Sequence, residues 1–208
     1  MADSKGFELT DRNPGWVKKD VPKNFADDDL KKLVLFYVIY TPCTDLSSSS
    51  ISMKRYGWDS DNVWRDQKLK NELFEVAGLV RNDTFISVKT IDMMKEACQK
   101  ANMTRSFCKN RQKERIVIYK PSKYNEFLAI CYHIRNAFAH GRLAVHSIKN
   151  SADIMFVLED GLNYNGKFQV RSRMILKKST LLRWIEIIDK KKLIIGNTAD
   201  EEKEPCLV

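Results

Sequence analysis

A change of hydrophobic period near Gly141 constrains the fold more than any other feature of this sequence. Before Gly141, apolar residues recur at intervals of three and four, the spacing of helices that bury one face. After it, segments 153–160 and 167–175 are rich in residues that favour strands and flank a glycine-bounded turn, which predicts a β-hairpin. We therefore expect a mainly α fold, a helical bundle with a C-terminal hairpin at about 153–175 and a final helix.

Three helices are expected in the first half of the chain. They are predicted by apolar stripes at helical spacing over about 26–41, 61–81 and 91–101. The first has acidic residues at its beginning, where the helix dipole favours them, and is closed by Pro42. The segment Ile116–Tyr119 is short and β-branched, and is either a strand or the end of a helix.

Two further helices are predicted near the motif and the C-terminus. One runs from about Tyr124 to Ala139, with Ser122 as its N-cap and Gly141 as the left-handed residue beyond its end. The last helix covers about 179–191 and begins at Ser179 or Thr180. Because its apolar residues recur at helical spacing, we expect it to pack one face on the core.

The length and composition favour one domain with tails. A chain of 208 residues with 43% apolar content is long and apolar enough to bury a core. We assign 1–25 to an N-terminal arm, 26–192 to the domain and 193–208 to a polar tail. The longest apolar run is too short to cross a bilayer and the N-terminus has no apolar signal core, so we expect a soluble, cytoplasmic protein without a membrane partner.

The five cysteines do not form a recognisable metal or redox motif. Their number is odd and no C-x-x-C unit occurs, so the sequence predicts free thiols in a reducing compartment. We expect no metal and no cofactor. The net charge of +9 is compatible with a polyanionic partner but is also common among proteins that bind no nucleic acid.

The segment from Arg135 to Gly141, Arg-Asn-Ala-Phe-Ala-His-Gly, contains the chain's clearest catalytic chemistry. The arginine can hold a phosphate with a rigid fork of donors, and His140 can exchange a proton near neutral pH. On a helix, Arg135 and His140 lie about 140° apart with Asn136 between them, so they do not touch directly. A second copy across a two-fold axis would bring two such pairs to one cleft, which predicts a homodimer with a composite site.

These residue types fit the metal-independent cleavage of RNA. RNA has its own nucleophile in the 2′-OH, and His140 could remove that proton or protonate the leaving 5′ oxygen. Arg135 would stabilise charge on the phosphate and Asn136 would orient His140 or contact a phosphate oxygen. The products would be a 2′,3′-cyclic phosphate and a 5′-hydroxyl. The alternative is structural, with Arg135 paired to an acid and His140 capping the helix C-terminus.

Further basic residues are predicted to contact RNA. They are Arg142 and His133 beside the motif, Arg171 and Arg173 on one face of the hairpin, and Arg111 in a basic run between 105 and 115. Each has an ordinary alternative, because charge runs are mostly solvated faces and a single histidine on a helix is mostly structural.

Arg135-Asn136-x-x-x-His140 resembles the R-x4-6-H motif of the HEPN superfamily, including the polar residue after the arginine. The resemblance implies a dimeric helical bundle with a metal-independent endoribonuclease site, in which Arg135 and His140 are catalytic and Asn136 supports them. It also implies a toxin or phage-defence role, with an antitoxin or sensor protein as a possible partner. Arg142 stands where related toxins have a modifiable tyrosine, so that form of regulation is not expected. The rival functions are a non-catalytic RNA-binding or scaffold HEPN protein, and a helical interaction module.

Overall fold

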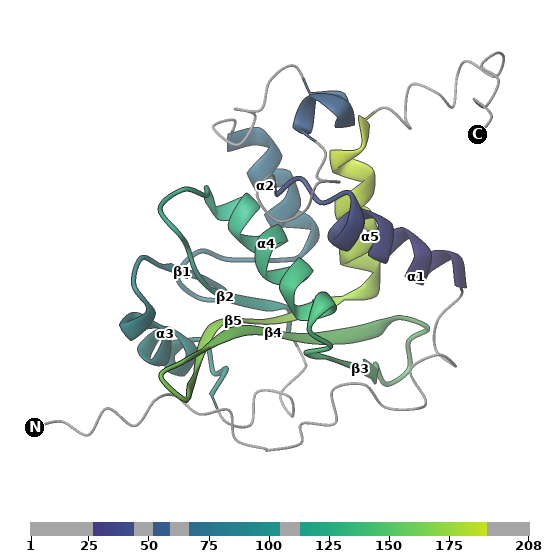
Figure 1. The fold of residues 1–208 in the computed structure, drawn as a ribbon. Coiled ribbons are helices and arrows are strands. Elements are labelled where there is room, and N and C mark those ends of the chain that lie inside the picture. Colours follow the sequence, from purple (N-terminus) through teal and green to yellow (C-terminus); the bar gives the residue numbers. More distant parts are fainter. Residues whose placement is uncertain (1–26, 44–51, 59–66, 105–112, 191–208) are drawn as a thin grey trace, which may run out of the picture.

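The computed structural model describes residues 27–43, 52–58, 67–104 and 113–190. They form a five-stranded mixed sheet with helices on both faces (Figure 1). The predicted mainly helical bundle is therefore wrong, and the fold is α+β. The N-terminal arm and the polar tail that the sequence predicted lie outside the described residues.

The sheet has the strand order β1-β2-β5-β4-β3. Only β1 and β2 pair in parallel, and the other neighbours are antiparallel. The strands are β1 (Phe85–Val88), β2 (Arg115–Tyr119), β3 (Leu143–Ser147), β4 (Ile154–Tyr164) and β5 (Lys167–Lys177). The segment that the sequence left open between strand and helix end is thus the strand β2, whereas β1 and β3 were not expected.

The predicted hairpin is confirmed as β4 and β5, the longest strands of the sheet. Its turn is Asn165-Gly166, where both residues have positive φ, the backbone that two-residue hairpin turns favour. The pairing shifts by one residue inside the hairpin, since Asp160 pairs with Ser172 and Gly161 with Val170. Arg171 is the extra residue of this bulge, so the strand alternation that would place Arg171 and Arg173 on one face is interrupted.

Four α-helices cover one face of the sheet and a fifth covers the other (Figure 1). Those on the first face are α1 (Asp27–Val34), α2 (Gln67–Val76), α4 (Glu126–Ala139) and α5 (Lys178–Ile188). On the opposite face lies α3 (Met94–Lys100), which follows a 3-10 turn at Ile91–Met93. A π-helix, η2 (Leu35–Ile39), continues α1, and a 3-10 turn, η3 (Met53–Tyr56), follows later.

Each face of the sheet has its own hydrophobic core. On the α4 and α5 side the core includes Phe127, Ile130, Phe156 and Trp184, all buried. The smaller core on the α3 side includes Val157 and its neighbours from alternate strand positions. Because successive strand residues point to opposite faces, β4 supplies side chains to both cores. The sheet is therefore buried on both sides along most of β4.

The ends of α4 show why this helix occupies residues 126–139. Asn125 is its N-cap and accepts a hydrogen bond from Leu128 N, so the predicted cap at Ser122 lies too early. At the other end Gly141 has φ of 63°, and Arg142 N donates to Ala137 O. This Schellman arrangement confirms the predicted left-handed glycine after the helix.

The start of α5 is fixed by two acids from distant strands or loops rather than by its own cap. Asp153 accepts from Ser179 N at 3.2 Å, and Glu114 accepts from Thr180 Oγ1 at 3.0 Å. The N-cap itself is Lys177 and has no side-chain cap, which corrects the prediction of Ser179 or Thr180. Acids at this end also suit the helix dipole.

Candidate functional site

The motif helix α4 lies on the sheet, and its polar residues do not all reach solvent. The apolar residues Phe127, Ile130, Ile134 and Ala137 of α4 are buried in the core. Its polar residues His133 and Asn136 are buried as well, because they face Asp160 of β4. The motif residues therefore occupy three different environments.

His133 is completely buried between two strands. Its Nδ1 lies 2.7 Å from Asp160 Oδ2 of β4, and its Nε2 lies 2.7 Å from the backbone oxygen of Tyr119 in β2. Both ring nitrogens are thus engaged with oxygen atoms of the sheet. The prediction that His133 contacts RNA is not supported by this position, because no part of the residue reaches the surface.

Asn136 is also buried, with 7% of its surface exposed, and it joins Asp160 to Arg135. Its Nδ2 donates to Asp160 Oδ2 at 3.2 Å, and its Oδ1 accepts from Arg135 Nη1 at 3.1 Å. Both ends of the amide are therefore used. The expectation that Asn136 orients His140 through its side chain is not met, since only its backbone oxygen reaches His140, by accepting from His140 N.

Arg135 is partly exposed, and within the described residues no carboxylate pairs with it. Among the described residues its hydrogen bond is the one from Nη1 to Asn136, and its buried Nε has no partner there. This position differs from the structural alternative, in which an acid neutralises the arginine. A guanidinium has five N–H donors, so Arg135 keeps most of them for another acceptor.

His140 is the C-cap residue of α4 and is exposed. No side chain in the described ranges hydrogen-bonds to its ring. A histidine at a helix C-terminus is also where a positive charge is favoured, so this half of the structural alternative agrees with the observed position. The structure thus places one motif residue in solvent, one at the boundary and one in the interior.

Asp160 is the residue that the sequence analysis missed. It follows Glu159 at the end of an apolar run, and strand alternation sends one acid to each face. Buried acids are rare unless paired. Two consecutive acids beside an apolar strand were therefore a usable signal for two buried ionic clusters, although the sequence alone names no partner.

On the α3 side, Glu159 is fully buried against Arg173. Arg173 Nε donates to Glu159 Oε2 at 3.1 Å, and its Nη1 donates to the carbonyl oxygens of Met103 and Thr104. Burial raises the pKa of Glu159 to about 8, and Arg173 and Arg142 oppose that rise. Arg173 has no exposed surface, so its predicted contact with RNA is not supported either.

The other predicted RNA contacts are distributed over the molecule. The guanidinium of Arg142 stacks on the ring of Phe168 at 3.8 Å and lies 3.8 Å from Glu159 Oε1, so it belongs to the α3 side. Arg171 is partly buried at the bulge. Arg111, with most of its basic run, lies outside the described residues. The structure therefore does not gather these arginines beside Arg135.

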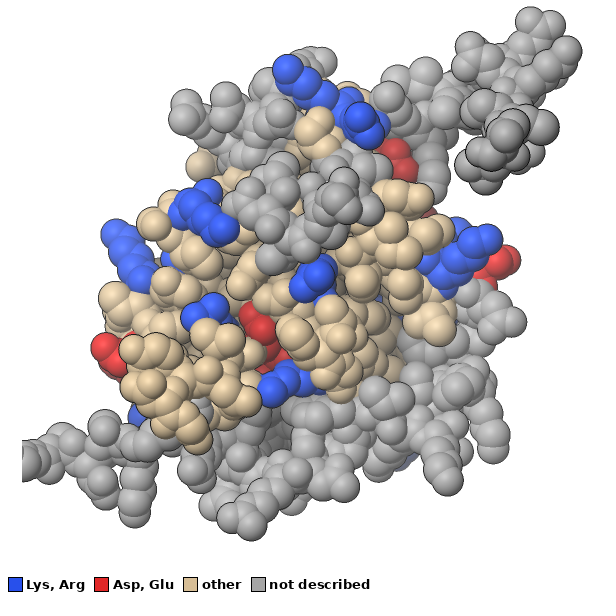
Figure 2. All heavy atoms as spheres, viewed as in Figure 1, with Lys and Arg blue, Asp and Glu red and all other residues tan. Residues whose placement is uncertain are grey.

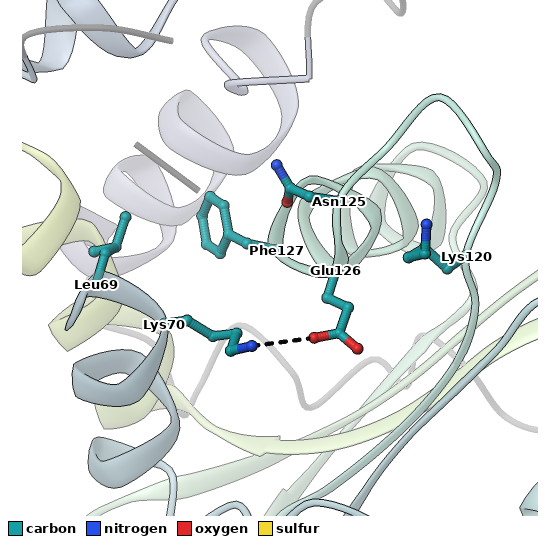
Figure 3. A pocket seen from close by; sticks show the side chains of 6 residues that line it. All are labelled: Leu69, Lys70, Lys120, Asn125, Glu126 and Phe127. Carbon is teal, nitrogen blue, oxygen red and sulfur yellow. Dashed lines mark ion pairs between the residues drawn. The ribbon is translucent and has the colours of Figure 1, made fainter. Parts of the chain in front are cut away.

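Neither of two cavities involves the motif. One of about 260 Å³ lies between α2 and the start of α4, where Lys70 approaches Glu126 (Figure 3). The other, about 870 Å³, lies between α1, η3 and α5 and is lined by Phe36, Tyr56 and Ile185 among others. On the face that Figure 2 shows, lysine and arginine side chains are spread over several elements rather than gathered in one patch.

The part of the chain that the structure describes contains no group of three His, Cys, Asp or Glu side chains that could hold a metal ion. Cys43, Cys98 and Cys131 are buried free thiols. Burial raises the pKa of Cys98 to about 12. Within the described ranges, no helix combines the length and apolar character needed to cross a membrane.

Comparison with known proteins adds no relative. No protein-family model, no curated protein and no solved structure matches this chain.

Proposed function

We propose that this chain is a metal-independent endoribonuclease in which Arg135 binds the scissile phosphate and His140 transfers a proton. The main support is the state of Arg135, which is oriented by a buried amide but not neutralised by any carboxylate among the described residues. Arginine pairs with phosphate through two parallel donors, and a guanidinium held by one Nη retains such a pair.

The exposed position of His140 supports a role in proton transfer. A solvent-facing imidazole can exchange protons with substrate and water near neutral pH. In the proposed reaction the 2′-oxygen attacks phosphorus as its proton passes to His140, and the bond to the 5′ oxygen breaks as that oxygen takes a proton from the second, protonated His140 of the dimer or from water. Cleavage yields a 2′,3′-cyclic phosphate and a 5′-hydroxyl, and Arg135 stabilises the charge on the non-bridging oxygens.

We infer that two copies of the chain build the site together. Among the described residues no hydrogen bond joins the His140 ring to Arg135 or Asn136, and the Asn136 amide bonds to Asp160 and Arg135 instead. A two-fold dimer through the exposed end of α4, where Ala139 and His140 reach the surface, would bring the histidine of one copy toward the arginine of the other. The resemblance of the motif suggests a cytoplasmic toxin or defence effector with an antitoxin or sensor partner.

The test is cleavage of labelled RNA by the purified protein in EDTA. We expect Arg135→Ala and His140→Ala each to lower the cleavage rate by about 100-fold or more. The matched control is Arg183→Ala, which removes an exposed arginine on α5 that pairs with Glu186 on the surface. This variant should cleave the RNA at the wild-type rate, and its expression should be as toxic to the host cells as expression of the wild type.

The outcomes separate the rival functions. RNA binding without cleavage, weakened by Arg135→Ala, would identify a non-catalytic RNA-binding protein. Neither binding nor cleavage, together with no toxicity on expression, would favour the interaction module. Sedimentation of the active protein as a monomer would contradict the shared site, whereas a mixture of the two inactive variants that regains activity would support it.

A further inference from the structure

We propose that Asp160 is the positioning residue of this site, because its carboxyl group joins the two halves of a hydrogen-bond chain that holds Arg135. The chain runs from the Tyr119 carbonyl through His133, Asp160 and Asn136 to the guanidinium. The geometry of these hydrogen bonds does not depend on the proposed function, whereas their importance for RNA cleavage rests on it.

The two ends of the chain fix the hydrogen atoms in it. The backbone oxygen of Tyr119 can only accept, so His133 Nε2, 2.7 Å away, must carry a hydrogen. At the other end the guanidinium of Arg135 can only donate, so the Asn136 atom facing it must be the oxygen Oδ1. The amide nitrogen of Asn136 then necessarily faces Asp160.

One proton is shared between His133 and Asp160. If neither Nδ1 nor Oδ2 carried it, two lone pairs would face each other at 2.7 Å in a buried site. The proton can lie on the ring, giving an ion pair, or on the carboxyl group, giving two neutral groups. In both cases His133, Asp160 and Arg135 together have a net charge of +1.

A carboxyl group is required at position 160 by this arrangement. Its Oδ2 meets His133 on one side and accepts from Asn136 Nδ2 on the other. An amide in its place offers one nitrogen and one oxygen. If the amide nitrogen of an Asp160→Asn variant faced His133 Nδ1, that nitrogen would also face the Asn136 nitrogen Nδ2. The Asn136 amide would then have to rotate and turn its nitrogen toward Arg135. If the amide oxygen of the variant faced both residues instead, His133 would have to carry hydrogens on both ring nitrogens, and its positive charge would have no counter-charge.

The backbone around Asp160 is held in place by close packing. Asp160 pairs with Ser172 immediately before the bulge, and the next residue is Gly161. A side chain at Gly161 would overlap the ring of Phe168 and the carbonyl oxygen of Gln169. The carboxyl group therefore comes from a rigid point of β4, which suits a residue that positions others.

The test compares Asp160→Asn with Glu159→Gln, its neighbour on the opposite face of the same strand. The first readout is the ¹⁵N resonance of Arg135 Nε–Hε, identified by its loss in Arg135→Lys. We expect Asp160→Asn to shift or broaden this resonance and to weaken binding of a short labelled RNA by about tenfold. Glu159→Gln should destabilise the fold but leave both readouts unchanged.

A second measurement keeps the proposal testable if Asp160→Asn does not fold. In the wild type, the side-chain Nδ2 hydrogens of Asn136 should exchange slowly with solvent because the amide is held at both ends. Free exchange of these hydrogens would overturn the proposal, as would an unchanged Arg135 resonance in folded Asp160→Asn. Neither readout needs catalysis, so absence of RNA cleavage in the wild type would reject the proposed function and leave this inference standing.

Discussion

Glu159 and Asp160 are adjacent in β4, yet they anchor two buried polar clusters that differ in one essential respect. The Glu159 cluster on the α3 side ends at Arg173, which is fully buried and donates to Glu159 and two backbone carbonyls. The Asp160 cluster on the α4 side extends through Asn136 to Arg135, which is partly exposed. The first cluster is closed, and the second reaches the surface. Both clusters contain buried ionisable groups, but of the two it is the Asp160 cluster that connects to an arginine reaching the solvent.

The largest effect on stability is expected at the closed cluster. Arg173→Ala would leave Glu159 and two carbonyl oxygens buried without this donor, and we expect it to lower the free energy of unfolding by about 3–5 kcal/mol. Urea unfolding measures the loss. Arg183→Ala, in an exposed pair, should cost at most about 0.5 kcal/mol. Similar losses for the two variants would show that the closed cluster does not stabilise the fold.

The second largest effect is expected from His133→Phe. It removes the partner of Asp160 while Asn136 can still donate to the carboxyl group, so we expect a loss of about 3 kcal/mol, toward the lower end for a broken buried pair. Tyr132→Phe, the neighbouring position, removes only a hydroxyl and is the matched control. If His133→Phe cost less than about 1 kcal/mol, the Asp160 cluster would be no more than a loosely held polar contact.

The pH dependence of stability should distinguish the two acids. Burial raises the pKa of Glu159 to about 8, so between its usual value and 8 the folded state binds more protons than the unfolded state. The free energy of unfolding of the wild type should therefore fall as pH rises through this range, by at most about 1.4 kcal/mol per pH unit from this group. Thermal or urea unfolding of Glu159→Gln should lack this contribution. If the free energy of unfolding of the wild type instead rose with pH relative to that of Glu159→Gln, Arg173 would be keeping Glu159 ionised.

The smallest effect on stability is expected at Arg142, which belongs to the Glu159 cluster and not to the Asp160 cluster that holds Arg135. Its guanidinium stacks on Phe168 and lies near Glu159 on the α3 side. Arg142→Ala should cost about 0.5–1 kcal/mol in unfolding experiments, the usual worth of such partly exposed contacts. Its RNA cleavage rate should equal that of the wild type. A large fall in the rate would instead support the sequence-based prediction that Arg142 contacts RNA.

The elements that could be predicted from the sequence are those with local signals. The hairpin was predicted from two β-rich runs around a glycine-bounded turn, although β4 continues to Tyr164 and the chain turns at Asn165-Gly166. The helix α4 has an apolar stripe and a glycine stop. The short strands β1 and β3 were missed because four or five residues give little periodicity. Their pairing with distant segments then decides that the fold is α+β rather than a helical bundle.

The candidate site divides in the same way. Arg135, Asn136 and His140 were identified because they lie along one predicted helix. Asp160 was missed because its contact with Asn136 spans 24 residues and depends on where β4 passes beneath α4. The burial of His133 follows from the same packing. His133 and Asn136 were predicted to contact RNA or support catalysis, because helix periodicity contains no information about a sheet on that side of the helix.

The end groups of the cleavage products test the central claim most directly. An RNA and a DNA of the same sequence are incubated with the wild-type protein in EDTA, and the products are analysed by mass spectrometry. We expect that only the RNA is cut, leaving a 2′,3′-cyclic phosphate and a 5′-hydroxyl, because the 2′-OH is the nucleophile. Cleavage of the DNA, or RNA products with 5′-phosphate ends, would contradict it.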